Sequence, residues 1–222
     1  MSKGGQGTFD LDADKLRALA LVPVSRETEA RLETYVKLLL LRRRNLNLVA
    51  SSTVRELWTR HITDSLQLLR LAPQARVWVD FGSGGGFPGL PIACALPDQP
   101  EAKVHLIESN GKKAAFLREA VRATGAPAIV HHERAEKFAE FCAETVDVVT
   151  ARALAPLKTL CDRAFPLITR GAIGLFLKGQ DVDAELTEAA KYWRLEGSKV
   201  ASTTSPQSSI VIVRSLEPLR SA

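Results

Sequence analysis

The sequence predicts an α/β fold in which helices flank a mostly parallel sheet, with a helical section at the N-terminal end. Short apolar runs rich in β-branched residues alternate with segments of helical periodicity from about residue 76 onward. A cluster of glycines directly follows the first apolar run, as in sheets that seat a nucleotide. Two neighbouring apolar runs near the C-terminal end, separated by a polar turn, indicate an antiparallel pair at the sheet edge.

The composition is that of an ordinary globular protein with a mild excess of positive charge. The chain has 222 residues, 45% of them hydrophobic, and a formal net charge of +5, which permits an anionic partner such as nucleic acid without requiring one. The three cysteines are widely spaced and are interpreted as reduced core thiols, and the histidines lack metal-ligand spacing, so we expect no metal. Such thiols indicate a cytoplasmic protein, and because no apolar run reaches transmembrane length, we expect no membrane partner. Nothing in the sequence requires a dimer, so we expect a monomer.

Three helices are expected in the N-terminal section, at residues 10–20, 25–43 and 53–71. Ser25 is a suitable N-cap for the second, and Thr53 with Glu56 three residues later has the spacing of a capping box for the third. We therefore divide the chain into a helical N-terminal section, 1–75, and an α/β domain, 76–222.

The α/β domain is expected to contain seven strands. The first five lie near 76–81, 103–108, 128–132, 146–151 and 171–178, and the last two near 194–203 and 209–217. Helices are expected near 88–96, 111–124, 135–143, 155–168 and 180–191. Strands joined through helices run parallel, so the sheet should be parallel except for an antiparallel terminal strand.

The glycine loop indicates which nucleotide it would hold. It reads Asp80-x-Gly82-x-Gly84-x-Gly86-Phe87; Phe87 replaces the small residue that ends a dinucleotide fingerprint, and no P-loop lysine follows. The Asp80 carboxylate would repel a phosphate and attract an ammonium group, and S-adenosylmethionine carries an ammonium and a sulfonium without any phosphate. The pattern resembles motif I of the Rossmann-like class I methyltransferases; a glycine-rich turn without a ligand is the alternative.

Five further residues at or after the expected strand ends are candidate site residues. Glu108 ends the second strand, where a carboxylate accepts both ribose hydroxyls; a solvated acid is the alternative. Ala135 and Glu136 follow the third strand, where adenine would lie, although a helix N-terminal turn explains Glu136 equally well. Arg152 and Lys178 end the fourth and fifth strands at the same rim, where Arg152 can clamp an anionic group. A structural salt bridge and an exposed turn lysine are their alternatives.

Polar residues of the N-terminal section form a second candidate set. Arg60, His61, Asp64 and Ser65 share one face at i,i+4 spacing. A surface ion pair accounts for two of them, and docking on the nucleotide domain or on a substrate accounts for all four. The basic helix end is a candidate phosphate contact, although a charge run is usually just solvated; it consists of Arg42, Arg43 and Arg44.

Several motifs taken together are similar to one family, the bacterial 16S ribosomal RNA guanine-N7 methyltransferases. They are Arg60-His61-x-x-Asp64-Ser65, the glycine loop continued to Gly89, Glu108-Ser109-x-Gly111-Lys112-Lys113-x-x-Phe116-Leu117, Arg152-Ala153 and Leu177-Lys178-Gly179-Gln180. The resemblance spans about residues 30 to 215. It departs at Gly85, where many members have proline, and at Glu108, where many have aspartate.

The resemblance implies a cofactor, a substrate and a reaction. S-adenosylmethionine would contact Gly82, Phe87, Ala135-Glu136 and Arg152, and the methyl group would go to N7 of one guanine in the decoding-region loop of 16S rRNA, free or within the 30S subunit. Guanine N7 carries a lone pair and no proton. In-line displacement therefore needs no general base, and Arg152 would act by orienting cofactor and target, an alignment that can supply roughly 7–11 kcal/mol of the barrier. A small-molecule methyltransferase and a catalytically silent RNA-binding protein are the competing hypotheses.

Overall fold

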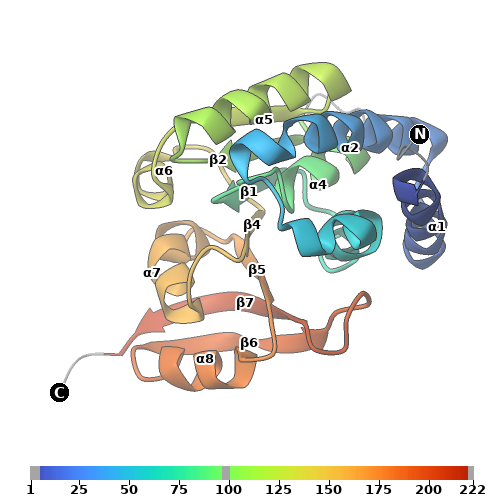
Figure 1. Cartoon of the computed structure of the whole chain (residues 1–222). Coiled ribbons are helices and arrows are strands. Elements are labelled where there is room, and N and C mark those ends of the chain that lie inside the picture. The colour runs from blue at the N-terminus through green and yellow to red at the C-terminus, as the bar shows by residue number, and fades with distance from the viewer. Residues whose placement is uncertain (1–5, 97–100, 220–222) are drawn as a thin grey trace.

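The sheet has seven strands, as predicted, in the computed structural model of the chain, which describes residues 6–96 and 101–219 (Figure 1). The strand order is β3-β2-β1-β4-β5-β7-β6. Their bounds are β1 Val77–Phe81, β2 Lys103–Ile107, β3 Ala128–His131, β4 Val148–Arg152, β5 Ile173–Lys178, β6 Trp193–Ala201 and β7 Ser209–Pro218. Strands β1 to β5 are parallel to one another, and β7 is antiparallel to both β5 and β6, which confirms the expected antiparallel pair at the sheet edge.

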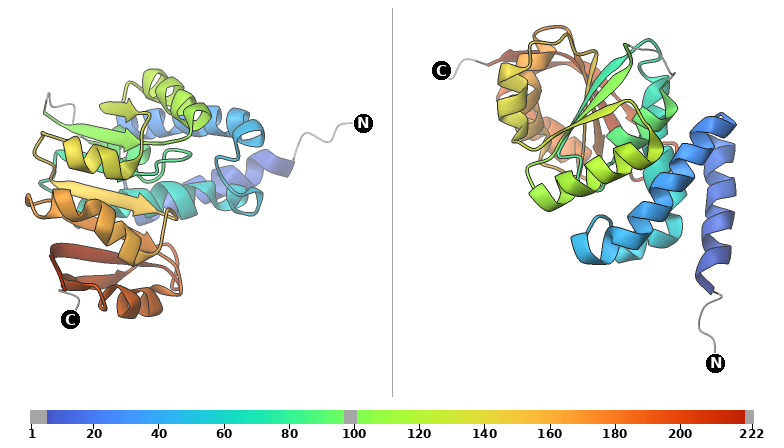
Figure 2. Two further views of the ribbon diagram at one scale, coloured as in Figure 1. Left: turned by 90° about the vertical axis from the view of Figure 1, so that its left-hand side faces the viewer. Right: turned by 90° about the horizontal axis from the view of Figure 1, so that it is seen from above.

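Helices cover both faces of the sheet, so its strands are buried on both sides. Helices α4 and α5 lie on one face with the N-terminal section, and α6, α7 and α8 contribute to the core on the other (Figure 2). Along β1, Trp78 belongs to the first core and Val79 to the second, because successive strand side chains point to opposite faces. The helix bounds are α4 Gly89–Ala95, α5 Gly111–Thr124, α6 Ala135–Phe141, α7 Leu157–Ile168 and α8 Val182–Ala189.

The N-terminal section begins with two long helices, α1 Gln6–Leu21 and α2 Arg26–Leu46. Ser25 caps α2 as predicted, its Oγ accepting the Thr28 amide at 3.1 Å. The following segment winds unevenly: a 3-10 turn η1 (Ser51–Glu56), a π-helix η2 (Trp58–Thr63), one α turn α3 (Asp64–Leu66) and a 3-10 turn η3 (Gln67–Arg70).

The capping box predicted at Thr53 is wrong. The N-cap of this segment is Ala50, and the Thr53 hydroxyl donates a hydrogen bond back to the Ala50 carbonyl at 3.0 Å. A threonine hydroxyl that donates in this way can still accept a hydrogen bond. The neighbouring donor is His61, whose Nε2 lies 2.9 Å from Thr53 Oγ1.

Buried polar contacts fasten the N-terminal section to the glycine loop and within itself. The Tyr35 hydroxyl of α2, a fully buried residue, donates to the Gly85 carbonyl at 2.5 Å. The buried Asp14 carboxylate of α1 accepts the Trp58 amide at 2.8 Å, which ties α1 to the π-helix. These contacts hold the π-helix beside the carboxyl ends of the strands, where the candidate site lies.

Candidate active site

The site lies where the strand order of the sheet reverses. Strand β1 lies inside the sheet; the chain goes on from it to β2 and β3 on one side and then crosses to β4 on the other. Phe81 at the end of β1 is in register with Ile107 of β2 and Ala151 of β4, so the segments that follow these strands meet at one rim. Such a switch point is where open α/β sheets bind their ligands.

Two cavities open at this rim. The glycine-loop cavity, about 220 Å³, brings together three of the predicted cofactor residues, Gly82, Ala135 and Glu136. Its other lining residues are Ile107, Ser109, Glu133, Arg134, Leu154 and Arg163. The Glu136 carboxylate forms an ion pair with Arg163 Nε at 2.5 Å.

The second, the arginine cavity of about 410 Å³, brings together four residues predicted from separate motifs, Arg60, His61, Arg152 and Lys178. Consecutive residues line the two cavities: Arg152 and Ala153 line one, and Leu154 lines the other. Ala153 has a φ of 52°, the left-handed region that a non-glycine residue seldom adopts. Backbone held in this way is concentrated at functional sites.

The glycines of the loop are required for different reasons. A Cβ on Gly85 would lie 2.6 Å from the Leu48 carbonyl oxygen, and one on Gly89 would lie 2.7 Å from Asp80 Cβ, so these two positions are glycine because protein packs against them. A Cβ on Gly84 would have only the Gly82 oxygen within 4 Å, at 3.6 Å, and Gly84 has a φ of +55°. At Gly84 the loop therefore presents bare backbone to space that no protein atom fills, which suits a ligand approaching closely.

Glu108 follows β2 and lies against this loop. Its Oε2 accepts the Gly84 amide at 2.8 Å and its Oε1 accepts the Asn110 amide at 2.7 Å, and the residue is buried. It is therefore not the solvated strand-end acid of the alternative interpretation. Each carboxylate oxygen keeps a second lone pair for a further donor.

Asp80 lies underneath the loop and lines neither cavity. It is fully buried; one oxygen accepts the Gly89 amide at 3.1 Å and the other accepts the Thr150 hydroxyl at 3.2 Å. Burial raises the pKa of this carboxyl group to about 7. We expected Asp80 to meet a ligand cation directly, and in the structure its observed contacts instead support the loop and the neighbouring strand.

Four groups surround the guanidinium of Arg152. Nη1 donates to the Arg60 carbonyl at 3.0 Å and lies 3.7 Å from the Asp64 carboxylate, and Nη2 donates to His61 Nδ1. The guanidinium carbon lies 5.1 Å from the centroid of the Phe87 ring, an arrangement typical of a cation–π contact. Asp64 and His61 therefore dock on the α/β domain, and the surface ion pair proposed between Arg60 and Asp64 is not formed: Arg60 lies 3.6 Å from Glu56 instead.

His61 is buried and neutral at ordinary pH. Burial, followed by the nearby positive charges of Arg152 and Arg60, lowers its pKa to about 3. Its ring packs against the Phe87 ring at 4.9 Å between centroids. A neutral imidazole can accept a hydrogen bond from a cation, which a protonated one cannot.

Three of the remaining predicted cations, Lys178, Arg42 and Arg43, contact other groups of the protein. Lys178 is not an exposed turn lysine: its side chain is 8% exposed, and its Nζ lies 2.6 Å from Glu185 and donates to the Ala155 carbonyl. Arg42 forms an ion pair with Glu119 of α5 at 2.8 Å, and Arg43 donates to the Leu40 carbonyl. Arg44 lies on α2, and its side chain falls outside what the structure describes.

Sequence reasoning missed one wall of the arginine cavity. Thr204, Ser205 and Ser208, in the turn between β6 and β7, line it together with Thr53 and Glu185. This turn was interpreted only as a connection; its unusual content of hydroxyl groups was the available signal.

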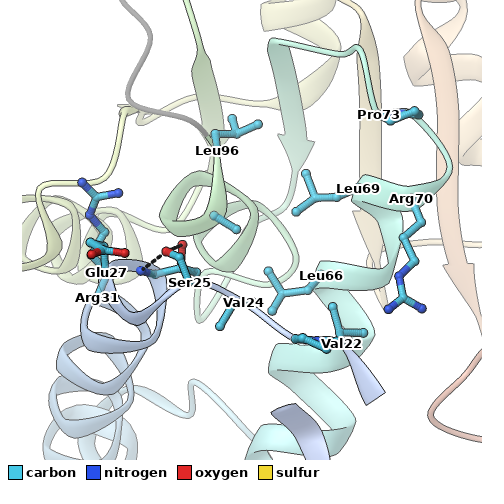
Figure 3. Close-up of a pocket in the computed structure, with 13 residues that line it drawn as sticks. Val22, Val24, Ser25, Glu27, Arg31, Leu66, Leu69, Arg70, Pro73 and Leu96 are labelled. Atoms are coloured by element: carbon cyan, nitrogen blue, oxygen red, sulfur yellow. Dashed lines mark hydrogen bonds between the residues drawn. The ribbon is translucent and has the colours of Figure 1, made fainter. Parts of the chain in front are cut away.

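A further cavity, of about 680 Å³, lies away from this rim (Figure 3). It is bounded by the link between α1 and α2, by the η3 region and by the end of α4, with the apolar side chains Val22, Leu66, Leu69 and Leu96. None of the predicted site residues lines it. Among residues 6–96 and 101–219, no helix has the length and apolarity to cross a bilayer, and no three His, Cys, Asp or Glu side chains are grouped to hold a metal ion.

A seven-stranded sheet of this order, with a glycine loop after β1, defines a class I methyltransferase fold. Solved structures agree. The chain superposes on the O-methyltransferase TomG from Streptomyces achromogenes, solved with SAM, with a TM-score of 0.58 over 96% of this chain and 100% of that one, at 14% identity. A putative O-methyltransferase from Klebsiella pneumoniae gives 0.57 over 94% and 99%, also at 14% identity. At these identities the likeness shows the fold alone.

The family follows from closer relatives. The model of the rRNA small subunit methyltransferase G family matches residues 28–213. The chain is 60% identical over 205 residues to ribosomal RNA small subunit methyltransferase G of Bradyrhizobium sp. strain BTAi1, covering 92% of each chain, and 58% identical to that of Nitrobacter hamburgensis, covering 92% of this chain and 79% of the relative. The chain belongs to this family of S-adenosylmethionine-dependent rRNA methyltransferases, as its motifs predicted.

Proposed function

We propose that this protein methylates N7 of a guanine in the decoding-region loop of 16S rRNA, by in-line displacement and without a general base. The observation that carries the proposal is that consecutive residues line the two cavities, Arg152 and Ala153 the arginine cavity and Leu154 the glycine-loop cavity. One cavity suits the cofactor and the other suits the target base, and a methyl group has to pass between them.

The glycine-loop cavity holds the cofactor in this proposal. Gly82, Ala135 and Glu136 line it. In the same loop Gly84 presents uncovered backbone, and its amide donates to Glu108, which follows β2.

This site suits a nucleoside without phosphates. The first amide of helix α4, that of Gly89, already donates to the buried Asp80 carboxyl group and is therefore not free to bind a phosphate. When bound, S-adenosylmethionine supplies a methyl group on a sulfonium.

The arginine cavity would receive the guanine. Arg152 is a half-buried cation there, and its guanidinium can donate to the guanine O6 that lies beside N7. No side chain of this cavity has to remove a proton, because N7 has none, and His61 is neutral and already engaged with Arg152. The chain's contribution is to orient the base and exclude water.

The experiment that tests the proposal locates the methyl group. The protein is incubated with labelled S-adenosylmethionine and either naked 16S rRNA or 30S subunits from cells that lack this activity. N7-methylguanine is then mapped by reduction and aniline cleavage. A single cleavage site in the decoding-region loop is expected in at least one arm; label at another base or atom, or none in either arm, would contradict the proposal.

Salt dependence separates an RNA substrate from a small neutral one. Binding of a polyanion releases counterions, so the logarithm of its affinity falls steeply with the logarithm of salt concentration. A nearly flat dependence of substrate binding between 50 and 200 mM salt, about the range over which phosphate contacts are usually compared, would favour the small-molecule alternative. Binding without any transfer of label would favour the catalytically silent one.

A further inference from the structure

A chain of three hydrogen bonds runs from the backbone of the N-terminal section to Arg152. The Thr53 hydroxyl donates to the Ala50 carbonyl at 3.0 Å, His61 Nε2 lies 2.9 Å from Thr53 Oγ1, and Arg152 Nη2 contacts His61 Nδ1. Thr53 is half-buried and His61 is buried, so water has limited access to the chain.

The direction of this chain is determined at both ends. A carbonyl oxygen only accepts, so in its contact with Ala50 the Thr53 hydroxyl is the donor. Because the hydroxyl has a single proton, Thr53 then accepts a hydrogen bond from His61. A guanidinium only donates, so His61 Nδ1 has to present a lone pair to Arg152. Both ends demand the same imidazole tautomer, protonated on Nε2 and unprotonated on Nδ1.

We propose that Thr53 and His61 are positioning residues, which hold the Arg152 guanidinium in place through this oriented chain. The proposal rests on the proposed function in one respect, that Arg152 orients the target. It assigns a role to the two turns of irregular helix: the 3-10 turn η1 carries Thr53 and the π-helix η2 carries His61. π-Helical turns are frequent at functional sites.

The alternative tautomer is excluded by the geometry of the same contacts. If Nδ1 carried the proton, it would face a guanidinium N–H, and a buried donor would meet a donor. The Nε2 lone pair would then face a hydroxyl whose proton is already bonded to Ala50. Two hydrogen bonds would be lost together, which is why the orientation of Arg152 depends on Thr53 although the two residues do not touch.

The test compares four substitutions. Thr53→Val keeps the shape and removes the hydroxyl; we expect kcat to fall about 2- to 12-fold, the effect of one hydrogen bond, with KM for the cofactor unchanged. His61→Leu should lower kcat about 10- to 100-fold, because a charge-assisted bond is lost. His61→Asn places an amide oxygen near the position of Nδ1, so its kcat should lie between those of His61→Leu and the wild type. Thr53→Ser keeps the hydroxyl, so its kcat should be higher than that of Thr53→Val.

A matched control and a direct readout separate positioning from general damage. Thr63→Val removes a buried hydroxyl from the same π-helix, one that donates to the Ala18 carbonyl and does not touch His61; it should lower stability and leave kcat unchanged. Nitrogen-15 NMR of the His61 ring should show the Nε2–H tautomer in the wild type and a mixture in Thr53→Val.

Three results would overturn the proposal. Arg152→Gln, which removes the guanidinium itself, is measured in the same assay as a reference. A wild-type His61 protonated on Nδ1 overturns the proposal, as does an unchanged kcat in both Thr53→Val and His61→Leu when Arg152→Gln is slow. An unchanged kcat in Arg152→Gln overturns this proposal and the role of Arg152 in the proposed function together.

Discussion

The Arg152 guanidinium of β4 lies over the Phe87 ring of the glycine loop, with 5.1 Å between its carbon and the ring centroid. Because one residue lines the arginine cavity and the other belongs to the loop beside the glycine-loop cavity, this contact joins the two halves of the proposed site. His61 and Tyr35 pack on the same ring, with centroids 4.9 and 5.5 Å away, so the N-terminal section also contacts it.

Replacing Phe87 by leucine removes the ring and keeps most of the apolar volume. A cation–π contact contributes about 0.5–2 kcal/mol, so methyl transfer should slow by roughly 2- to 30-fold, with little change in RNA binding. Single-turnover assays at saturating cofactor measure this step. Phe165→Leu, which removes a ring that packs on Trp193 at 4.9 Å in the other core, is the control and should lower only stability. Equal rates in wild type and Phe87→Leu would show that the ring does not orient Arg152.

Replacing Gly84 by arginine should abolish cofactor binding while the fold persists, because its missing side chain faces open space. The backbone strain of a positive φ, about 1–2 kcal/mol, has to be allowed for. Gly125→Arg is the matched control: its φ is +62°, a Cβ there would meet nothing within 4 Å, and it caps the end of α5. Calorimetric titration should find no heat of binding for Gly84→Arg and wild-type affinity for Gly125→Arg. Retained affinity in Gly84→Arg would place the cofactor elsewhere.

Replacing Glu108 by glutamine should have two measurable effects. One of the two backbone amides it now accepts would face an N–H₂ group, which costs about 1–3 kcal/mol of stability. Loss of the charged acceptor for the sugar should weaken cofactor binding by about tenfold or more. Thermal unfolding measures the first effect and equilibrium binding the second. A lowered melting temperature with unchanged affinity would limit Glu108 to supporting the loop.

The raised pKa of Asp80 predicts that the free energy of unfolding depends on pH. Its pKa is raised from an ordinary 3.8 to about 7 by burial, so between these values the folded chain keeps a proton that the unfolded chain releases. Its contribution is therefore fully present below pH 3.8 and is lost as pH rises through 7. At about 1.4 kcal/mol per pKa unit the loss is at most about 4 kcal/mol.

Asp80→Asn stays neutral and can keep the bond from the Gly89 amide, so it removes this dependence. Its melting temperature minus that of the wild type should increase from pH 4 to pH 7 and then level off, a range about as wide as the shift itself. A difference that stays constant over this range would mean that Asp80 is ionised throughout.

The fold was predictable from the sequence because its signals are local. Alternation of apolar runs with helical periodicity gave the seven strands and the helices α4 to α8 within a few residues, and Ser25 marked the start of α2. The failure at Thr53 is also local: the same pattern fits a capping box and a 3-10 turn, and the sequence contains nothing that selects between their hydrogen bonds.

What the sequence determined by itself was the list of chemical groups: a glycine loop, carboxyl groups at 80 and 108, and cations at 152 and 178. The tertiary structure decided what each of them meets. Asp80 lies beneath the loop, Lys178 pairs with Glu185, and Arg152 is held by His61 from a segment some 90 residues away in the chain. Local patterns fix backbone conformation, whereas these pairings depend on how the N-terminal section packs across the sheet, and no short stretch of sequence records that packing.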